Sequence, residues 1–313
     1  MTTVFVAGSL NVDQCIRVTD LPGAGETVVG SHLVHTVGGK GGNQAVAAAR
    51  GGASVVMLGA VGDDADGARV LKTLVESGVD VTHVRFAPQP TGLAIITVDT
   101  QGENSIVLSS GANADLREAD IDDGLVEMAS GDILLLQLES PESVVRHAAH
   151  VAKRHGAKVV LNAAPAPTTI DGLLDDVDVL IVNEHEARSI GGAVGISGDD
   201  GASLVADLAA AFALTVVCTA GARGAYANVD EVVVHVAGIA VQAVDTTAAG
   251  DTFVGYLAAQ LAKRPDSLLA ALDQATRAAA LTVTRHGSMT AIPTVEDVQH
   301  ALGPNYVSLG GIR

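Results

Sequence analysis

The segment with the clearest potential for chemistry is the run 244–253 (VDTTAAGDTF). The Ala- and Leu-rich stretch after it predicts a helix that begins near Asp251. The small residues Ala248, Ala249 and Gly250 would let consecutive backbone N–H groups at the start of this helix surround an anion. Asp251 beside such an anion hole is a candidate general base, which accepts a proton from a hydroxyl nucleophile. The alternative interpretation is an ordinary acid in the first turn of a helix.

A glycine-rich run at 38–43 (GGKGGN) opens a second Ala-rich stretch and is a candidate ligand loop. Glycines let a ligand approach the backbone closely, and the free N–H groups at the start of a helix face that ligand. A turn with only a structural role is the alternative. The residues that this run offers to a ligand are Gly39, Lys40, Gly41, Gly42 and Asn43.

Asn11 and Asp13 directly follow the first predicted strand, Val4–Ala7. In an open α/β sheet, ligands bind at the carboxyl ends of the strands. Together with Lys40 and Asn43, these two residues offer the mixture of donors and acceptors that sugar hydroxyl groups require. Either residue alone could instead cap a helix or stabilise a turn.

The composition and the missing motifs exclude several other classes of protein. A formal net charge of −18 argues against nucleic-acid or anionic membrane partners, because such partners bind cationic surfaces. The chain lacks the GxxxxGK(S/T) motif of P-loop NTPases, since Gly41 follows Lys40, and it has no GxGxxG motif after the first strand. A phosphorylated ligand would therefore be held by backbone N–H groups, a divalent metal and a few cations.

The cysteines and the hydropathy predict a protein of the cytoplasm. Cys15 and Cys218 are the only cysteines, and they lie far apart without the spacing of a disulfide framework. The N-terminal residues lack the basic flank of a signal peptide, and no apolar run reaches the roughly 18 residues of a membrane span.

Short β-branched runs alternate along the chain with Ala-rich helical stretches. This alternation predicts an α/β fold, with a doubly wound, mostly parallel sheet flanked by helices. A content of 48% hydrophobic but only 2% aromatic residues suits buried strands under Ala-rich helices. The predicted strands are Val4–Ala7, Ser54–Leu58, Ile133–Leu138, Val159–Asn162, Val179–Val182 and Thr215–Thr219. The predicted helices are Asn43–Gly51, Asp64–Ser77, Pro141–His155, Gly201–Phe212 and Asp251–Ala262.

Two segments break this rhythm, because they carry β-rich patterns with turn residues and no helix between the strands. They predict a small antiparallel β lid, formed by about 12–37 and 91–110 and inserted into a single domain of residues 1–313. A lid of this kind excludes water from a group-transfer reaction. If one face of the lid covers a substrate, its other face and edges need cover, which favours pairing of two lids in a homodimer.

The sequence resembles the PfkB carbohydrate kinase family. The N-terminal signature of that family matches the run 38–45 (GGKGGNQA), its C-terminal signature matches 245–253, and the similarity extends from about Val4 to Pro293. The resemblance implies the fold of that family, a doubly wound sheet with a small β lid. It also implies an ATP-dependent sugar kinase with Asp251 as the catalytic base and Gly250 in the anion hole.

The resemblance further assigns roles to individual residues, although from the residues alone Glu139, Glu186 and Arg223 could be helix-entry or surface residues. The implied sugar ligands are Asn11, Asp13, Gly39, Lys40, Asn43 and Glu139. An NxxE element associated with nucleotide, phosphate and magnesium matches Asn183 and Glu186. The implied loop for the ATP phosphates is Thr219, Ala220, Gly221, Ala222, Arg223 and Gly224. Thr276 occupies a position near the adenine where His or Asn is common, so nucleotide preference stays open.

The family also binds a monovalent cation, usually potassium, beside the anion hole. The matching positions are Asp245, Thr247, Thr282, Arg285, Gly287 and Ala291. Ala291 stands where a serine is common, which removes one hydroxyl group, but several of the implied contacts are backbone carbonyls. The resemblance therefore implies activation by K⁺.

The function that this resemblance implies is phosphorylation of D-ribose at O5 by ATP and Mg²⁺. Kinases of the same family that act on deoxyribose, fructose or a nucleoside are the nearest alternatives, and the scarcity of aromatic residues disfavours a nucleoside, whose base would need stacking. A sugar-binding protein without catalytic activity is the alternative from another class, since fold alone does not establish function.

Overall fold

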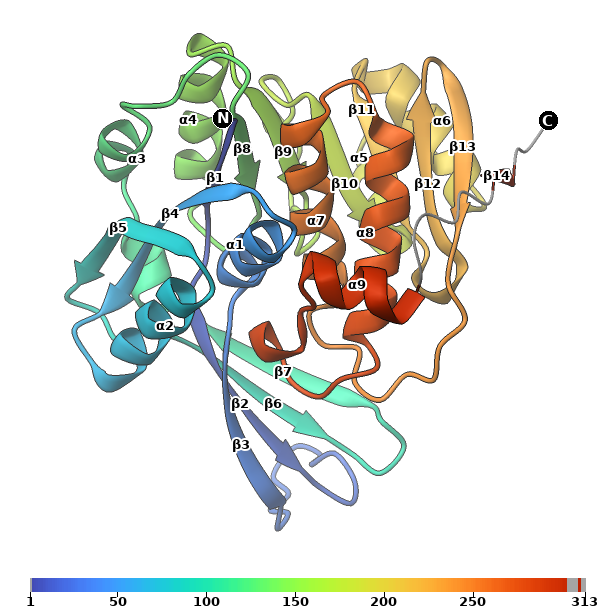
Figure 1. The fold of residues 1–313 in the computed structure, drawn as a ribbon. Helices are drawn as coiled ribbons and strands as arrows, with labels where there is room; N and C mark the ends of the chain where they lie inside the picture. Colours follow the sequence, from blue (N-terminus) through green and yellow to red (C-terminus); the bar gives the residue numbers. More distant parts are fainter. Residues whose placement is uncertain (1, 303–308, 311–313) are drawn as a thin grey trace.

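The centre of the fold is a ten-stranded sheet, seen here in a computed structural model that describes residues 2–302 and 309–310 (Figure 1). Neighbouring strands are parallel from β5 to β11, and β12, β13 and β14 continue the sheet as antiparallel strands. In spatial order the strands are β14 (Leu309–Gly310), β13 (Val232–Ala237), β12 (Gly224–Val229), β11 (Thr215–Thr219), β10 (Val179–Asn183), β9 (Lys158–Asn162), β8 (Ile133–Leu136), β1 (Thr3–Ala7), β4 (Ser54–Gly62) and β5 (Val79–Ala87).

Helices cover both faces of this sheet, so each buried strand must present apolar residues in both directions. In β1, Val4 and Val6 belong to one hydrophobic cluster, whereas Phe5 and Ala7 belong to the other. One face is covered by α1 (Lys40–Arg50), α2 (Ala65–Glu76), α7 (Ala249–Lys263), α8 (Leu268–Thr282) and α9 (Val295–Leu302). The other is covered by α3 (Glu118–Gly124), α4 (Glu142–Arg154), α5 (Glu184–Ala193) and α6 (Gly201–Phe212). The predicted doubly wound fold is confirmed.

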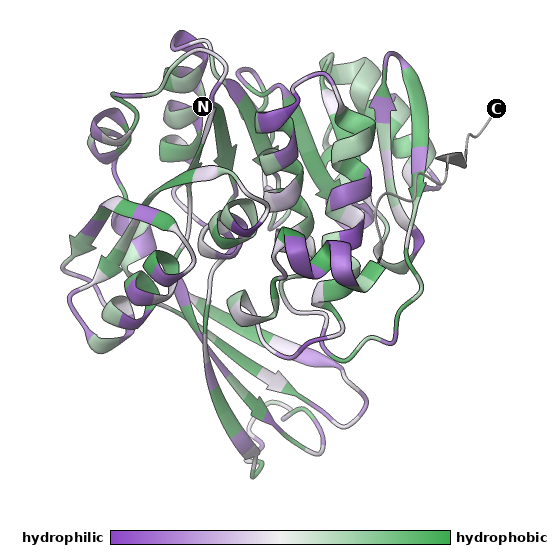
Figure 2. Cartoon of the chain, in the orientation of Figure 1, coloured by the Kyte–Doolittle hydropathy of each residue, from purple (hydrophilic) through white to green (hydrophobic). Residues whose placement is uncertain are grey.

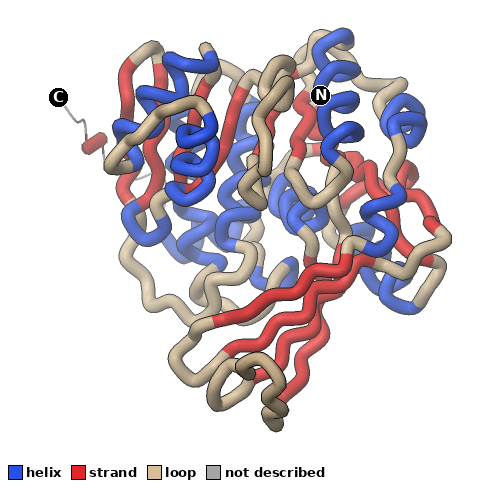
Figure 3. Tube along the Cα trace, turned by 180° about the vertical axis from the view of Figure 1, so that it is seen from behind, coloured by secondary structure: helices blue, strands red, loops and turns tan. Residues whose placement is uncertain are grey.

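A second, four-stranded sheet projects from this body, as the view from behind in Figure 3 shows. Its strands in spatial order are β3 (Ser31–Gly38), β2 (Asn11–Arg17), β6 (Gly92–Val98) and β7 (Asn104–Ser109). Two separate segments of the chain thus form a small sheet, as expected. Its outer pairs are antiparallel, whereas the central pair of β2 and β6 is parallel, because both strands leave the core in the same direction.

The two sheets differ in how they bury hydrophobic residues. Figure 2 shows apolar residues along the strands of both sheets and hydrophilic residues on the flanking helices. In the small sheet, however, many of these apolar side chains remain exposed. They are Leu33, Val34, Ile95, Ile106, Val107 and Leu108.

Most predicted elements occur within a few residues of their expected bounds. Helix α1 begins at Lys40, three positions before the predicted start, since Gly39 with φ of 89° ends the preceding strand. Helix α7 begins at Ala249, because Ala248 adopts φ of 59°. Strand β4 runs on to Gly62, beyond the predicted Leu58. Within residues 2–302 and 309–310, no helix is long and apolar enough to cross a membrane.

Candidate active site

Asp251 lies in the first turn of α7, at the carboxyl edge of the parallel strands, as predicted. Gly250 and Asp251 occupy early helical positions, whose N–H groups have no acceptor inside the helix. The space beside Gly250 is open, with no atom within 4 Å of the position that a Cβ would take. The N–H of Ala249 is turned inward and donates to the Thr246 carbonyl at 3.3 Å. The N–H groups that stay available at this helix start are therefore those of Gly250 and Asp251, and the N–H of Ala249 is already paired.

Two amides hold the carboxylate of Asp251. Asn43 Nδ2 donates to Asp251 Oδ2 at 2.8 Å, and Gln44 Nε2 donates to Asp251 Oδ1 at 2.9 Å. Both amides belong to the first turns of α1, which the glycine-rich run starts. Asn43 is fixed from its other end, because the hydroxyl of Ser288 donates to its Oδ1 at 2.9 Å. The two signature segments of the sequence thus meet at one carboxylate.

The predicted sugar ligands lie where β1 passes into β2 and where α1 begins. Asn11 and Asp13 are the first and third residues of β2, so they stand at the hinge between the core and the small sheet. Asn11 Oδ1 accepts a hydrogen bond from Asn113 Nδ2 at 2.7 Å. Glu139 Oε2 accepts from the Ser9 hydroxyl at 2.6 Å and from the Lys40 backbone N–H at 3.2 Å. These contacts fix the Asn11 and Glu139 acceptor groups near the start of α1.

The carboxylates of Asp13, Glu139 and Asp251 lie close enough for their charges to interact. Burial, with the charges of Glu139 and Asp251, raises the pKa of Asp13 from 3.8 to about 7. The charge of Asp251, with those of Glu139 and Glu186, raises the pKa of Lys40 despite its burial. Lys40 is therefore a firmly protonated cation among acidic groups. Such an arrangement suits a ligand that is polar at one end and anionic at the other.

One cavity is lined both by the start of α7, which carries Asp251, and by several of the predicted nucleotide residues. Asn183 and Glu186 form a capping box at the start of α5, with Asn183 N–H donating to Glu186 Oε2 at 2.8 Å. Burial raises the pKa of Glu186. Lys40 is the cation among the lining residues of this cavity. The full lining comprises Lys40, Asn162, Ala164, Ile181, Val182, Asn183, Glu186, Thr219, Thr246, Ala248, Ala249, Gly250, Asp251 and Val254.

The rest of the predicted nucleotide loop is more open. Gly221 has φ of 57° with empty space around it, and Gly224 has φ of 96° against the backbone of Val236. Arg223 is exposed and pairs with Glu184 at 2.5 Å, while Ala220 and Ala222 lie in the same turn. Thr219 is the member of this loop that lines the cavity.

Thr276 stands apart from that loop, in the middle of α8. It is buried, and its Oγ1 has no hydrogen-bond partner among the described residues. It does not line the cavity beside Asp251. The structure thus brings Thr219 to Asp251 but leaves Thr276 outside their cavity.

Four of the six positions implied for a monovalent cation lie on two neighbouring loops, whereas Thr282 is the last residue of α8 and Ala291 is the last residue of a short 3-10 helix. Asp245 Oδ1 accepts from the Thr247 N–H at 2.9 Å, and Asp245 Oδ2 accepts from the Gly287 N–H at 3.0 Å. Burial acts to raise the pKa of Asp245, but these hydrogen bonds hold it below its ordinary value. The Thr282 carbonyl accepts from Arg285 N–H at 3.0 Å, and Ala291 is buried in the turn that follows.

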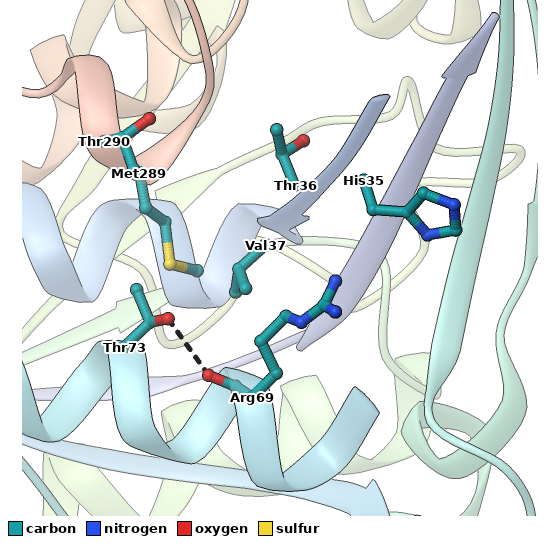
Figure 4. A pocket seen from close by; sticks show the side chains of 7 residues that line it. All are labelled: His35, Thr36, Val37, Arg69, Thr73, Met289 and Thr290. Atoms are coloured by element: carbon teal, nitrogen blue, oxygen red, sulfur yellow. Dashed lines mark hydrogen bonds between the residues drawn. The ribbon is translucent and has the colours of Figure 1, made fainter. Parts of the chain in front are cut away.

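A separate surface hollow lies between β3, α2 and the turn Met289–Ala291 (Figure 4). It does not include Asp251 or the predicted ligands. Met289 closes one wall, and a Cβ on Gly42 would lie 2.4 Å from its methyl carbon. The hollow therefore lies beside α1, and Asp251 is not among its lining residues. Its lining residues are His35, Thr36, Val37, Arg69, Thr73, Met289 and Thr290.

Several residues of the site escaped prediction from the sequence. They are Ser9, Gln44, Asn113, Gln137, Asn162 and Ser288. For Gln44 a signal existed, since it directly follows Asn43 in the glycine-rich signature. Each of the others has a side-chain partner that lies more than 90 positions away along the chain.

Comparison with known proteins agrees with this geometry. The model of the pfkB family of carbohydrate kinases matches residues 1–295. A ribokinase of Haemophilus influenzae is 40% identical over 306 residues, covering 96% of this chain and 99% of the relative. The crystal structure of a Thermotoga maritima ribokinase superposes with a TM-score of 0.86 at 30% identity, covering 96% of this chain and 99% of that one. The structure of an Arabidopsis thaliana ribokinase complexed with ribose and ATP gives a TM-score of 0.82 at 29% identity, covering 96% and 97%.

Fold and site together define an enzyme that transfers a phosphoryl group to a carbohydrate. The chain belongs to the pfkB family of carbohydrate kinases.

Proposed function

We propose that this enzyme transfers the γ-phosphoryl group of ATP to O5 of D-ribose, giving D-ribose 5-phosphate and ADP. The observation that carries the proposal is the carboxylate of Asp251, held by Asn43 and Gln44 beside the open start of α7. Nearly full-length similarity to ribokinases supports ribose as the sugar.

The sugar is bound through its hydroxyl groups at the hinge of the small sheet. Asn11, Asp13, Asn43 and Glu139 supply acceptors and donors from three elements, and Gly39, Gly41 and Gly42 let the ring approach the backbone. A Cβ on Gly38 would lie 2.1 Å from Asp13 Oδ2, so a glycine there keeps the carboxylate in place. The small sheet acts as a lid that excludes water once the sugar is bound.

Asp251 acts as the general base. It accepts the proton of the O5 hydroxyl as that oxygen attacks the γ-phosphorus and the bond to the ADP oxygen breaks. The N–H groups at Gly250 and Asp251, with the partial positive charge of the α7 start, stabilise negative charge on the transferred group. Lys40 adds a full positive charge to the same cavity.

ATP lies along the edge formed by α5 and the loop after β11. Thr219, Gly221, Arg223 and Gly224 border its phosphates, and the open space around Gly221 fits a close approach of backbone and phosphate. Glu186 fits Mg²⁺ held mainly by ATP phosphates, because one carboxylate with few protein ligands is its usual protein contribution. When bound, Mg²⁺ neutralises phosphate charge.

A K⁺ ion fits beside Asp245, whose carboxylate is already held between the loops that carry Thr247 and Gly287. Such an ion would order these loops next to the anion hole. We expect activity to fall when K⁺ is replaced by tetramethylammonium, which is too large for a site between the loops. Unchanged turnover in that buffer would contradict the assignment.

The enzyme is a cytoplasmic homodimer that pairs through its lid. Strand registers place Leu33, Ile95 and Val107 on the face of the small sheet opposite to Asp13, and all three are exposed. A second lid would cover this face. Light scattering at micromolar concentration tests the pairing, and a monomeric mass would contradict it.

The reaction is tested by coupled ADP release with ATP and Mg²⁺ against D-ribose, 2-deoxyribose, D-fructose and adenosine. We expect D-ribose to give the highest kcat/KM. A preference for another of these sugars would replace the substrate but keep the mechanism. No turnover with any of them would favour a sugar-binding protein without catalytic activity.

A further inference from the structure

We propose that Gln44 is a positioning residue, which fixes the rotation of the Asp251 carboxylate and is itself fixed by Asn162 and Gln137. This inference rests on the proposed role of Asp251 as the base. Gln44 is fully buried, with 0% of its surface exposed, so it acts on the reaction through Asp251 and not through contact with substrate.

Asp251 needs such a partner because of its own flexibility. Helix α7 fixes the backbone of Asp251, but the torsion that rotates a carboxylate plane has a broad, soft profile. Two hydrogen bonds to different oxygens define that plane, one from Asn43 and one from Gln44. Asn43 is also a predicted sugar ligand, so its bond to Asp251 competes with substrate. Gln44 is the donor that stays when the sugar arrives.

The hydrogen bonds of Gln44 allow a single orientation of its amide. Its Nε2 donates to Asp251 Oδ1 at 2.9 Å and to Asn162 Oδ1 at 3.0 Å, and its Oε1 accepts from Gln137 Nε2 at 2.7 Å. Turning the amide by 180° would bring its oxygen against two acceptors and its nitrogen against a donor. Every polar atom of the side chain is thus used to point a donor at the base.

The orientation is set by the main chain of the central sheet. Asn162, at the end of β9, donates through Nδ2 to the Ile181 carbonyl of β10 at 3.1 Å. A backbone carbonyl is always an acceptor, so it determines which end of the Asn162 amide faces Gln44. A chain of hydrogen bonds therefore leads from β10 through Asn162 and Gln44 to Asp251, without any group that titrates before the base itself.

Gln137 holds Gln44 in place, but its own carbonyl oxygen is left unpaired. It follows β8, is fully buried, and leaves its Oε1 without a hydrogen-bond partner among the described residues. Buried acceptors are rarely left unpaired in this way. The carbonyl is packed over Gly8, where a Cβ would lie 1.9 Å from Oε1. The hydrogen bond from Gln137 to Gln44 is thus kept at the expense of an unpaired buried carbonyl. This favours the arrangement of the site over the stability of the fold.

The test compares Gln44→Met, which removes the donor at similar volume, with Gln44→Glu. For Gln44→Met we expect kcat to fall by about 10- to 100-fold, with KM for sugar and ATP within about twofold, because a misplaced base costs rate and not binding. For Gln44→Glu we expect the loss to be larger at pH 8 and to shrink toward pH 6, because a protonated carboxyl can donate to Asp251 whereas an ionised one repels it. The Gln44→Met to wild-type ratio should stay flat over this range.

Asn228→Leu is the control, since Asn228 is a half-buried amide away from the site, where it accepts from the Val216 N–H and donates to the Leu214 carbonyl. It should lower Tm and leave kcat unchanged. A Gln44→Met kcat within twofold of wild type, or a change confined to KM, would overturn the inference.

The inference and the proposed function fail separately. If the wild type phosphorylates no sugar, the proposed function is lost, and a crystal structure of Gln44→Met then decides the positioning role by itself. A rotated Asp251 carboxylate in that structure supports the role, and a carboxylate in its wild-type orientation rejects it.

Discussion

On the proposed sugar side of Asp251, the side chains of Asn11, Asn43 and Glu139 are each hydrogen-bonded to another side chain. On the nucleotide side, Gly221 and Gly250 border open space. The sugar side is therefore organised before any ligand binds, whereas the nucleotide side is shaped by backbone that a phosphate can still approach. The difference fits the chemistry, because a base must be aimed at one hydroxyl, while phosphates are held by many weak backbone contacts.

Replacing Asp251 tests the organised side most severely. Asp251→Asn should lower kcat by about a thousandfold or more, because the amide cannot accept the hydroxyl proton. Binding of sugar measured by calorimetry and the Tm should change little, since Asn keeps the volume and an oxygen for one of the two amide donors. Near-normal turnover in this variant would remove Asp251 from the mechanism.

Glu139→Gln should act on sugar binding and not on chemistry. We expect the KM for ribose to rise by roughly 10- to 100-fold, the loss of one charge-assisted hydrogen bond, with kcat and the KM for ATP nearly unchanged. Ser9→Ala, which removes the hydroxyl that donates to Glu139, should give a smaller change in the same direction. An equal rise in the KM for ribose and in the KM for ATP would contradict a role of Glu139 in sugar binding alone.

Asp13→Asn should have a pH-dependent effect on the stability of the fold, in addition to its effect on sugar binding. The pKa of Asp13 is raised from 3.8 to about 7, so between these values the folded protein binds a proton that the unfolded chain has lost. The contribution of Asp13 to stability therefore falls as pH rises from about 4 to 7. The full rise in the pKa of Asp13 corresponds to a loss of at most about 4 kcal/mol in the free energy of unfolding.

The Asp13→Asn variant should thus melt several degrees above wild type at pH 8 and close to it at pH 4, while losing affinity for sugar. Calorimetric melts at both pH values measure this. An equal difference in Tm at the two pH values would show that ionisation of Asp13 is not the cause.

Arg223→Ala should give the smallest effect, on the open side. Arg223 is 58% exposed at its side chain and pairs with Glu184, so we expect a two- to fivefold rise in the KM for ATP and none in the KM for ribose. Glu184→Gln sharpens the test, because it frees Arg223 and should lower the KM for ATP slightly. Opposite changes in the two variants would support contact of Arg223 with phosphate, and identical changes would refute it.

The sequence alone determined the α/β fold, the two-segment sheet and the position of Asp251 at a helix start. Hydrophobic alternation, glycine-rich runs and small residues before an acid are local signals, since they follow from the preferences of neighbouring residues. For the same reason the predicted bounds fail at Lys40 and Ala249, where the backbone torsions of Gly39 and Ala248 start the helices earlier.

Only the tertiary structure decided what surrounds Asp251. The amide of Gln44 lies 207 positions from Asp251 along the chain and 93 from Gln137, so their contact depends on how α1, α7 and β8 are stacked. The raised pKa of Asp13 likewise needs burial, together with the charges of Glu139 and Asp251. Side-chain partners at such separations leave no local pattern, because the sheet order and the packing of its helices bring them together.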